Sequence, residues 1–201
     1  MDFNAASEYI FGRLHRELKP ALSYHCMEHT VDVLAATRRL ADAELIEPYP
    51  RILLETAALY HDAGMIVQYK DHESASVVLA DQSLAGFGYS VPEIEEVCNL
   101  IMVTKLPQRP YNHLEQILCD ADLDYLGQDI FFINSFKLRL EWHVNGIKST
   151  TLPEWFDIQS KFLTEHEYFT KSAITLRNEK KLKHLAEIKE LLSQSNLKSK
   201  S

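Results

Sequence analysis

The chain has 201 residues, 46% of them hydrophobic, and a formal net charge of −8. This composition predicts a globular protein with a sizeable core, and the acidic charge argues against a protein that binds nucleic-acid polymers through a basic surface. The three cysteines form no CxxC pair, and the sequence shows neither the pattern of a signal peptide nor an apolar run of about 18 residues, so we expect a cytoplasmic protein without a membrane partner.

Gly and Pro are few, 6 and 7 residues respectively, which favours helices over a β architecture with many turns. Hydrophobic periodicity then places the helices in chain order. They are predicted at residues 2–18, 31–45, 51–62, 74–84, from 91 onward and at 114–126, with further helical segments within 128–145 and 153–193. No strand pattern is present, so the prediction is an all-α fold.

The third predicted helix ends in an ionisable pair, His61-Asp62, followed closely by Gly64. The helix is apolar on most sides, which is typical of a central helix. Burying the pair costs several kcal/mol unless something compensates, and a divalent metal ion does so by binding a neutral imidazole and an ionised carboxylate. We therefore predict a metal site here, with Gly64 in the left-handed conformation that ends a helix. For these two residues alone, a capping pair at a helix end is the alternative.

Further ligands are expected from the neighbouring helices. His29 opens the preceding helix, and consecutive helices usually pack against each other. One row along the helix at 114–126 consists of Leu114, Leu118, Asp122 and Leu126. Its leucines predict that Asp122 points inward, where a buried carboxylate needs a partner. Asp120 and Asp124 share a different row and are expected on a solvated face or as supports for the ligands.

The order His…His-Asp…Asp on a helical background resembles the HD-domain superfamily of metal-dependent phosphohydrolases. The matching segments are Glu28-His29-Thr30, Leu59-Tyr60-His61-Asp62-Ala63-Gly64, Asp71-His72-Glu73-Ser74 and Asp120-Ala121-Asp122-Leu123-Asp124. The metal ligands that the resemblance implies are His29, His61, Asp62 and Asp122. It also implies a compact multi-helix HD-domain bundle with additional C-terminal helices. We expect one domain, 1–201, with its core at about 22–127 and a helical extension at 128–193.

The predicted cofactor is one divalent metal ion. Mixed imidazole and carboxylate ligation suits Mn, Fe, Co, Ni, Zn or Mg, and the number of ligands does not choose among them. One ion is favoured because the binuclear branches of the superfamily carry further histidines near the position of Thr104, where this chain has no histidine pair. His72 is a candidate ligand for a second ion or a candidate for proton transfer.

Hydrolysis of a phosphate ester by a metal-activated water also needs proton transfer. The candidate groups for this step are His25, His72 and Glu73. Asp62, besides acting as a ligand, can orient the water. Tyr24-His25 is similar to the start of the Tyr-His-Asn segment of cyclic-nucleotide phosphodiesterases, but Cys26 stands in place of the asparagine. The role that the histidine has in those enzymes therefore transfers only weakly.

Lys105 and Arg109, in the loop before the helix at 114–126, are candidate phosphate contacts, although cations in loops are often only solvated. Together these residues predict a metal-dependent phosphohydrolase that acts on a nucleotide or another small phosphate mono- or diester. The alternatives are a catalytically silent HD module that senses a nucleotide, and oxygen-dependent di-iron chemistry, which would need more histidines. A homodimer and the role of residues 128–201 are left open.

Overall fold

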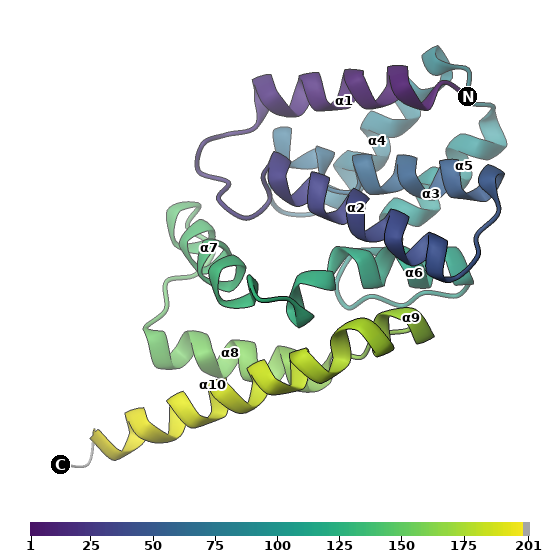
Figure 1. The fold of residues 1–201 in the computed structure, drawn as a ribbon. Coiled ribbons are helices and arrows are strands. Elements are labelled where there is room, and N and C mark those ends of the chain that lie inside the picture. The colour runs from purple at the N-terminus through teal and green to yellow at the C-terminus, as the bar shows by residue number, and fades with distance from the viewer. Residues whose placement is uncertain (199–201) are drawn as a thin grey trace. The chain divides into compact units, whose positions relative to one another are not determined.

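The computed structural model describes residues 1–198, and the regular elements in this range are all helical. The chain divides into two compact units, unit 1 spanning Met1–Leu123 and unit 2 beginning at Asp124 (Figure 1). The predicted all-α fold is therefore confirmed, whereas the description of 1–201 as one domain stays a prediction. No helix in the described range has both the length and the hydrophobicity needed to cross a membrane.

Unit 1 is organised around one central helix. Its helical elements are α1 (Phe3–Glu17), α2 (Met27–Ala43), α3 (Pro48–Tyr60), η1 (Ala63–Ile66), α4 (His72–Leu84), η2 (Ala85–Phe87), α5 (Val91–Val103) and α6 (His113–Asp122). The central helix is α3, which packs against α1, α2, α5 and α6. Every residue from Leu53 to Tyr60 is buried, as expected for a helix that is apolar on nearly all sides.

The starts of α2, α4 and α6 set the positions of several predicted site residues. α2 begins at Met27, earlier than predicted, so His29 lies in its first turn. α4 also begins earlier than predicted, at His72. The start of α6 is fixed by Asn112, whose side-chain oxygen accepts a hydrogen bond from the backbone N–H of Glu115 at 3.0 Å.

Gly64 does not adopt the left-handed conformation, so that prediction is wrong. Its role is close packing instead, because a Cβ atom at this position would lie 2.6 Å from the backbone nitrogen of Ser76 and 2.8 Å from Cβ of Ala75. The N–H of Gly64 donates to Oγ of Ser76 at 2.7 Å. η1 therefore lies directly against α4, which brings His72 at the start of α4 close to Asp62.

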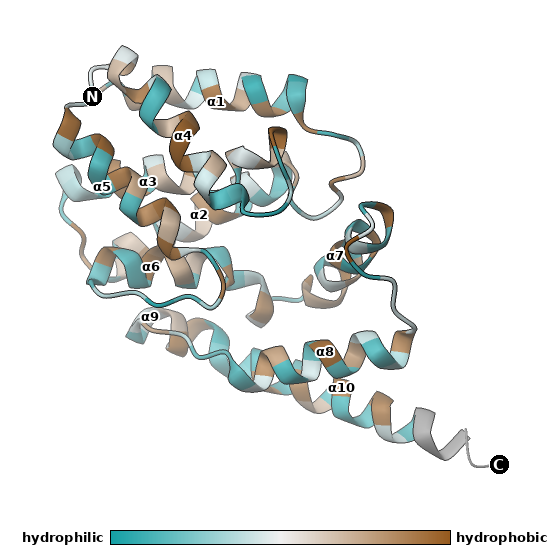
Figure 2. Cartoon of the chain, turned by 180° about the vertical axis from the view of Figure 1, so that it is seen from behind, coloured by the Kyte–Doolittle hydropathy of each residue, from teal (hydrophilic) through white to brown (hydrophobic). Residues whose placement is uncertain are grey.

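Unit 2 is formed by the C-terminal helices. Its elements are η3 (Asp124–Gly127), α7 (Phe131–Val144), α8 (Leu152–Glu165), α9 (Lys171–Ala173), the π-helical turn η4 (Ile174–Asn178) and α10 (Glu179–Lys198). α8 and α10 pack against each other, and hydrophobic and hydrophilic residues alternate along both (Figure 2). Trp155 of α8 is fully buried, and its indole N–H donates to Oγ of Ser135 at 2.9 Å.

Candidate metal centre

Four side chains at three helix ends meet at one point in unit 1. His29 lies in the first turn of α2, His61 and Asp62 directly follow α3, and Asp122 is the last residue of α6. These ends are close together because α3 packs against both α2 and α6. The structure thus brings together all four residues that were predicted as metal ligands, although they are distant in the sequence.

Both carboxylates lie at similar distances from the two imidazole nitrogens. Nε2 of His29 lies 3.4 Å from Nε2 of His61. Oδ2 of Asp62 lies 3.3 Å and 3.2 Å from these two nitrogens, and Oδ1 of Asp122 lies 3.4 Å and 3.6 Å from them. Donor atoms that are bound at about 2.0–2.2 Å to one ion are separated by about 3–3.6 Å. The spacing therefore fits a shared metal ion.

One carboxylate oxygen at this point lacks a hydrogen bond. Oδ2 of Asp62 is buried and makes no hydrogen bond to any described residue. It lies 3.3 Å and 3.2 Å from the Nε2 atoms of His29 and His61, so protons on those nitrogens or a shared cation must balance its charge. A divalent ion bound by both imidazoles and this oxygen would do so. The burial and the chemistry of these donors thus fit a divalent metal ion.

His61 is held in the tautomer that a metal ion requires. Its side chain is 1% exposed, and its Nδ1 donates to the backbone carbonyl oxygen of Ala58 at 2.8 Å. Because Nδ1 is engaged in this hydrogen bond, Nε2 is the nitrogen left for a metal ion, and it faces His29, Asp62 and Asp122. A backbone acceptor behind a metal-binding histidine commonly fixes the ring in this way.

Protons and a metal ion compete for this centre. Burial favours the neutral form of His29, but the carboxylates of Asp122 and Asp62 outweigh it and raise its pKa to about 10. Burial also lowers the pKa of His61, but the same two carboxylates outweigh burial and raise it. Burial alone would raise the pKa of Asp62, but His61 and His29 lower it well below its usual range. Metal uptake by these residues therefore requires release of protons from the imidazoles.

Comparison with known protein families shows where this site belongs. Residues 26–124 match the family model of the HD domain. This part of the chain is an HD domain. The predicted resemblance is therefore confirmed, and the HD domain, which is found in metal-dependent phosphohydrolases, contains all four candidate ligands. Searches of curated proteins and of solved structures found no significant match.

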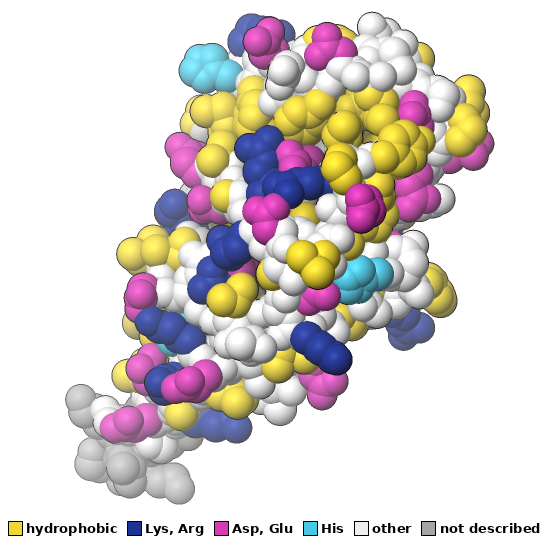
Figure 3. Space-filling model, turned by 45° about the vertical axis from the view of Figure 1, so that its right-hand side comes forward, with side chains coloured by type: hydrophobic (Ala, Val, Ile, Leu, Met, Phe, Trp, Pro, Cys, Tyr) yellow, Lys and Arg dark blue, Asp and Glu magenta, His cyan; other side chains and the backbone are white. Residues whose placement is uncertain are grey.

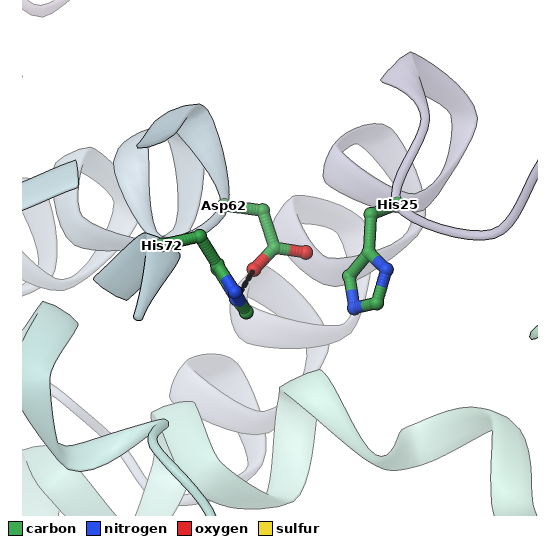
Figure 4. A group of neighbouring side chains, drawn as sticks. All are labelled: His25, Asp62 and His72. Carbon is green, nitrogen blue, oxygen red and sulfur yellow. Dashed lines mark ion pairs between the residues drawn. The ribbon is translucent and has the colours of Figure 1, made fainter. Parts of the chain in front are cut away.

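The HD domain holds a second group of candidate ligands. Donor atoms of His25, Asp62 and His72 lie within 4.8 Å of one another, and Figure 4 shows Asp62 between the two imidazole rings. Nε2 of His72 lies 3.0 Å from Oδ1 of Asp62, and its Nδ1 lies 3.1 Å from the carbonyl oxygen of Tyr69. Burial lowers the pKa of His72, but the hydrogen bond to Asp62 outweighs this effect and raises it to about 9. Both ring nitrogens of His72 therefore act as donors at neutral pH.

The other proton-transfer candidates lie beside His72. Glu73 is buried in the first turn of α4, and its Oε1 is 3.7 Å from Nε2 of His72. The ring of His25 is half-buried, with its centroid 5.4 Å from that of His72. The structure thus gathers the three predicted proton-transfer groups around Asp62.

The predicted phosphate contacts lie in the loop between α5 and α6. Lys105 forms an ion pair with Asp71, the residue that precedes α4. Lys105 and Arg109, together with Tyr111, line a cleft of about 320 Å³. None of the four candidate metal ligands lines this cleft. The structure therefore connects Lys105 to the neighbourhood of His72 but does not bring the described side chain of Arg109 to the metal centre.

Asp120 and Asp124 do not lie on a solvated face, so that part of the expectation is wrong, whereas a supporting role for the ligands stays a prediction. Asp120 is 0% exposed and Asp124 is 2% exposed. α6 packs against α2, α3 and α5, so more than one side of this helix is buried. The helix also ends at Asp122, short of the predicted Leu126, which removes Asp124 from the helical row that the prediction assumed. In unit 2, Asp124 instead accepts a hydrogen bond from Nε of Arg177 at 2.7 Å.

Gln108 is a residue of the HD domain that sequence reasoning missed. It lies in the loop between α5 and α6, and its Nε2 donates to Oδ2 of Asp122 at 3.0 Å. A loop glutamine takes part in no helical periodicity, so no spacing rule relates it to the ligands. Its position between Lys105 and Arg109 is the sequence signal that could have drawn attention to it.

Proposed function

We propose that the HD domain binds one divalent metal ion and hydrolyses a nucleotide or another small phosphate mono- or diester. The proposed ligands are His29, His61, Asp62 and Asp122. The observation that carries this proposal is their convergence: the two imidazole nitrogens lie 3.4 Å apart, and one oxygen of each aspartate lies 3.2 to 3.6 Å from both of them. A divalent ion supplies an activated water near neutral pH and polarises a phosphoryl oxygen. Mn, Fe, Co, Ni, Zn and Mg all suit these ligands.

In this proposal the chain's own side chains handle the proton. His72 donates through Nε2 to Oδ1 of Asp62 and through Nδ1 to the carbonyl oxygen of Tyr69. It thereby orients the Asp62 carboxylate and holds a proton that the leaving oxygen of a phosphate ester can accept. Glu73 and His25 lie next to His72 and are the further candidates for proton transfer.

The proposed partner is a small phosphorylated molecule, with a nucleotide preferred. Lys105, paired with Asp71 just before α4, offers a cation to the phosphate at the metal centre. Arg109 and Tyr111, in the cleft that Lys105 lines, offer a second cation and a ring on which a base can stack. On the face drawn in Figure 3, acidic and basic side chains are intermixed. A polymer of nucleic acid is bound by a continuous basic surface, so this distribution supports a small substrate.

One ion is proposed because the second group of candidate ligands is already engaged. His72 and Asp62 are hydrogen-bonded to each other, with Nε2 and Oδ1 3.0 Å apart. An ion bound by His25, Asp62 and His72 would have to break that bond and remove the proton from Nε2. The main centre, by contrast, offers two imidazoles and two carboxylates to one ion in return for the protons that the ion displaces.

The test compares metal-stripped protein with protein reconstituted in Mn²⁺, first for bound metal and then for hydrolysis of generic phosphate mono- and diesters and of nucleotides. We expect one ion per chain and turnover that depends on it. Asp62→Ala removes both a ligand and the carboxylate that His72 orients, so turnover should fall by about a thousandfold or more. Asp32→Ala, an exposed aspartate of α2, is the matched control and should retain turnover.

Each outcome separates the candidate functions. Protein that binds no divalent ion overturns the proposal, and two ions per chain overturn the single-ion assignment. Tight binding of a nucleotide without turnover, across several metals, identifies the silent sensing module instead. Turnover that persists in Asp62→Ala shows that hydrolysis takes place elsewhere.

A further inference from the structure

The carboxylate of Asp122 is held from outside the metal centre by a loop residue. Nε2 of Gln108 lies 3.0 Å from Oδ2 of Asp122 and 3.4 Å from the backbone carbonyl oxygen of Thr104. Both neighbours are acceptors, so the amide NH₂ group, and not the amide oxygen, faces them. The side chain of Gln108 is thus fixed at its amide end by two hydrogen bonds.

The two oxygens of Asp122 consequently have different surroundings. Oδ1 lies 3.4 Å and 3.6 Å from the Nε2 atoms of His29 and His61, whereas Oδ2 accepts the hydrogen bond from Gln108. We propose that Gln108 is a positioning residue that restricts Asp122 to binding the metal ion through one oxygen, an inference that rests on the proposed function. A carboxylate bound through one oxygen leaves a coordination position for water or substrate.

The two oxygens of Asp62 also have different surroundings, which supports this assignment. Its Oδ1 accepts from His72 at 3.0 Å, and its Oδ2 lies 3.3 Å and 3.2 Å from the same two histidine nitrogens. Each carboxylate therefore presents one oxygen to the centre and gives the other to a donor outside it. The outside donor is a helix residue for Asp62 and a loop residue for Asp122.

The location of Gln108 gives the hydrogen bond a further consequence. Its neighbours Lys105 and Arg109 line the cleft that we assign to the phosphorylated substrate. One loop therefore carries both the predicted phosphate contacts and the residue that orients a metal ligand. Changes in that loop are expected to alter metal binding even in the absence of substrate.

The experiment measures the dissociation constant of Mn²⁺, without substrate, for the full chain and for three variants. Gln108→Ala removes the amide, and Gln108→Met keeps the length of the side chain while removing the donor. Gln116→Ala removes an equally half-buried glutamine from α6 and is the matched control. We expect both Gln108 variants to weaken Mn²⁺ binding by about 10- to 100-fold, as is typical when a partner behind a metal ligand is lost, and Gln116→Ala to bind like the parent.

A spectroscopic measurement distinguishes positioning from general loosening of the fold. At saturating Co²⁺, the visible absorption of the metal should differ between the parent protein and Gln108→Met, because Asp122 becomes free to bind through both oxygens. Equal Mn²⁺ affinities, unchanged Co²⁺ spectra, or a loss that occurs in Gln108→Ala but is restored in Gln108→Met would overturn the inference. A parent protein that binds no metal would instead overturn the proposed function.

Discussion

Asp122 and Asp124 are two residues apart in the chain, yet their carboxylates have opposite surroundings. In unit 2, both oxygens of Asp124 accept hydrogen bonds from the guanidinium of Arg177, at 2.7 Å and 3.1 Å. In unit 1, Asp122 and Asp62 face two imidazoles, and Oδ2 of Asp62 makes no hydrogen bond within the described part of the chain. Both regions bury carboxylates, but their partner is a guanidinium in unit 2 and a pair of imidazoles in unit 1.

This difference separates a structural carboxylate from one that is prepared for a ligand. A buried ion pair in which each group is hydrogen-bonded contributes to the fold and calls for no further partner. A buried carboxylate that faces only imidazoles is different, because those imidazoles lose their protons at a metal site. Its negative charge is then balanced by the bound cation. The state of each oxygen is therefore more informative than the burial of the residue.

The comparison predicts the largest change in stability in unit 2. Asp124→Ala leaves the guanidinium of Arg177, which is 20% exposed, without its partner. Removing one member of a buried pair typically destabilises a protein strongly, so we expect the free energy of unfolding to fall by about 3 kcal/mol, measured by urea denaturation.

The matched control for this change is Asp129→Ala. Asp129 pairs with Lys180 in the same unit, but its side chain is 91% exposed. Exposed pairs contribute little, so this variant should unfold like the parent. If Asp124→Ala were no less stable than Asp129→Ala, the structural role assigned to the buried pair would be wrong.

Metal binding in unit 1 should depend on pH. The raised pKa of His29, about 10, means that a proton occupies a ligand nitrogen at neutral pH. A metal ion must displace it, so affinity should rise as pH rises, by about tenfold per pH unit for each proton released. Dissociation constants for Mn²⁺ measured between about pH 6 and pH 8 test this sign. Affinity that is constant over this range would contradict proton competition at His29.

The smallest expected effect concerns an exposed pair, Lys105 and Asp71. Lys105 is 47% exposed, so a phosphate can reach its amine while Asp71 is solvated. Lys105→Ala should raise KM a few-fold with little change in kcat, because the lost contact stabilises the bound substrate and the transition state alike. Lys19→Ala, another exposed lysine of unit 1, is the control. An unchanged KM in steady-state assays of Lys105→Ala would remove this residue from the substrate site.

Short-range patterns were sufficient to predict the helices and much of the centre. The apolar run that ends in His61-Asp62 indicated a central helix, and the packing of consecutive helices placed His29 beside its end. The row of leucines pointed to Asp122, which the structure does bring to the centre. These inferences needed only the period of a helix and the cost of burying charge.

The remaining features depend on tertiary packing that the sequence does not display. Asp120 was expected on a solvated face because the row argument assumes one buried side, but α6 is covered by α2, α3 and α5. Gln108 reaches Asp122 through the course of a loop, which no periodicity describes. Gly64 was expected to end a helix in the left-handed conformation. Glycine is needed there instead because residues of α4 leave no room for a side chain.

The tight fit at Gly64 has a consequence for how inactive variants are interpreted. A side chain there would clash with the backbone of His72 and Ser76 and with Ala75, so the first turn of α4 would have to shift, and the contact between His72 and Asp62 depends on that turn. Such a variant could lose turnover while every ligand and every proton-transfer group is still encoded. A screen for lost activity would therefore be expected to return Gly64, a position without any functional group, among the residues that perform the chemistry.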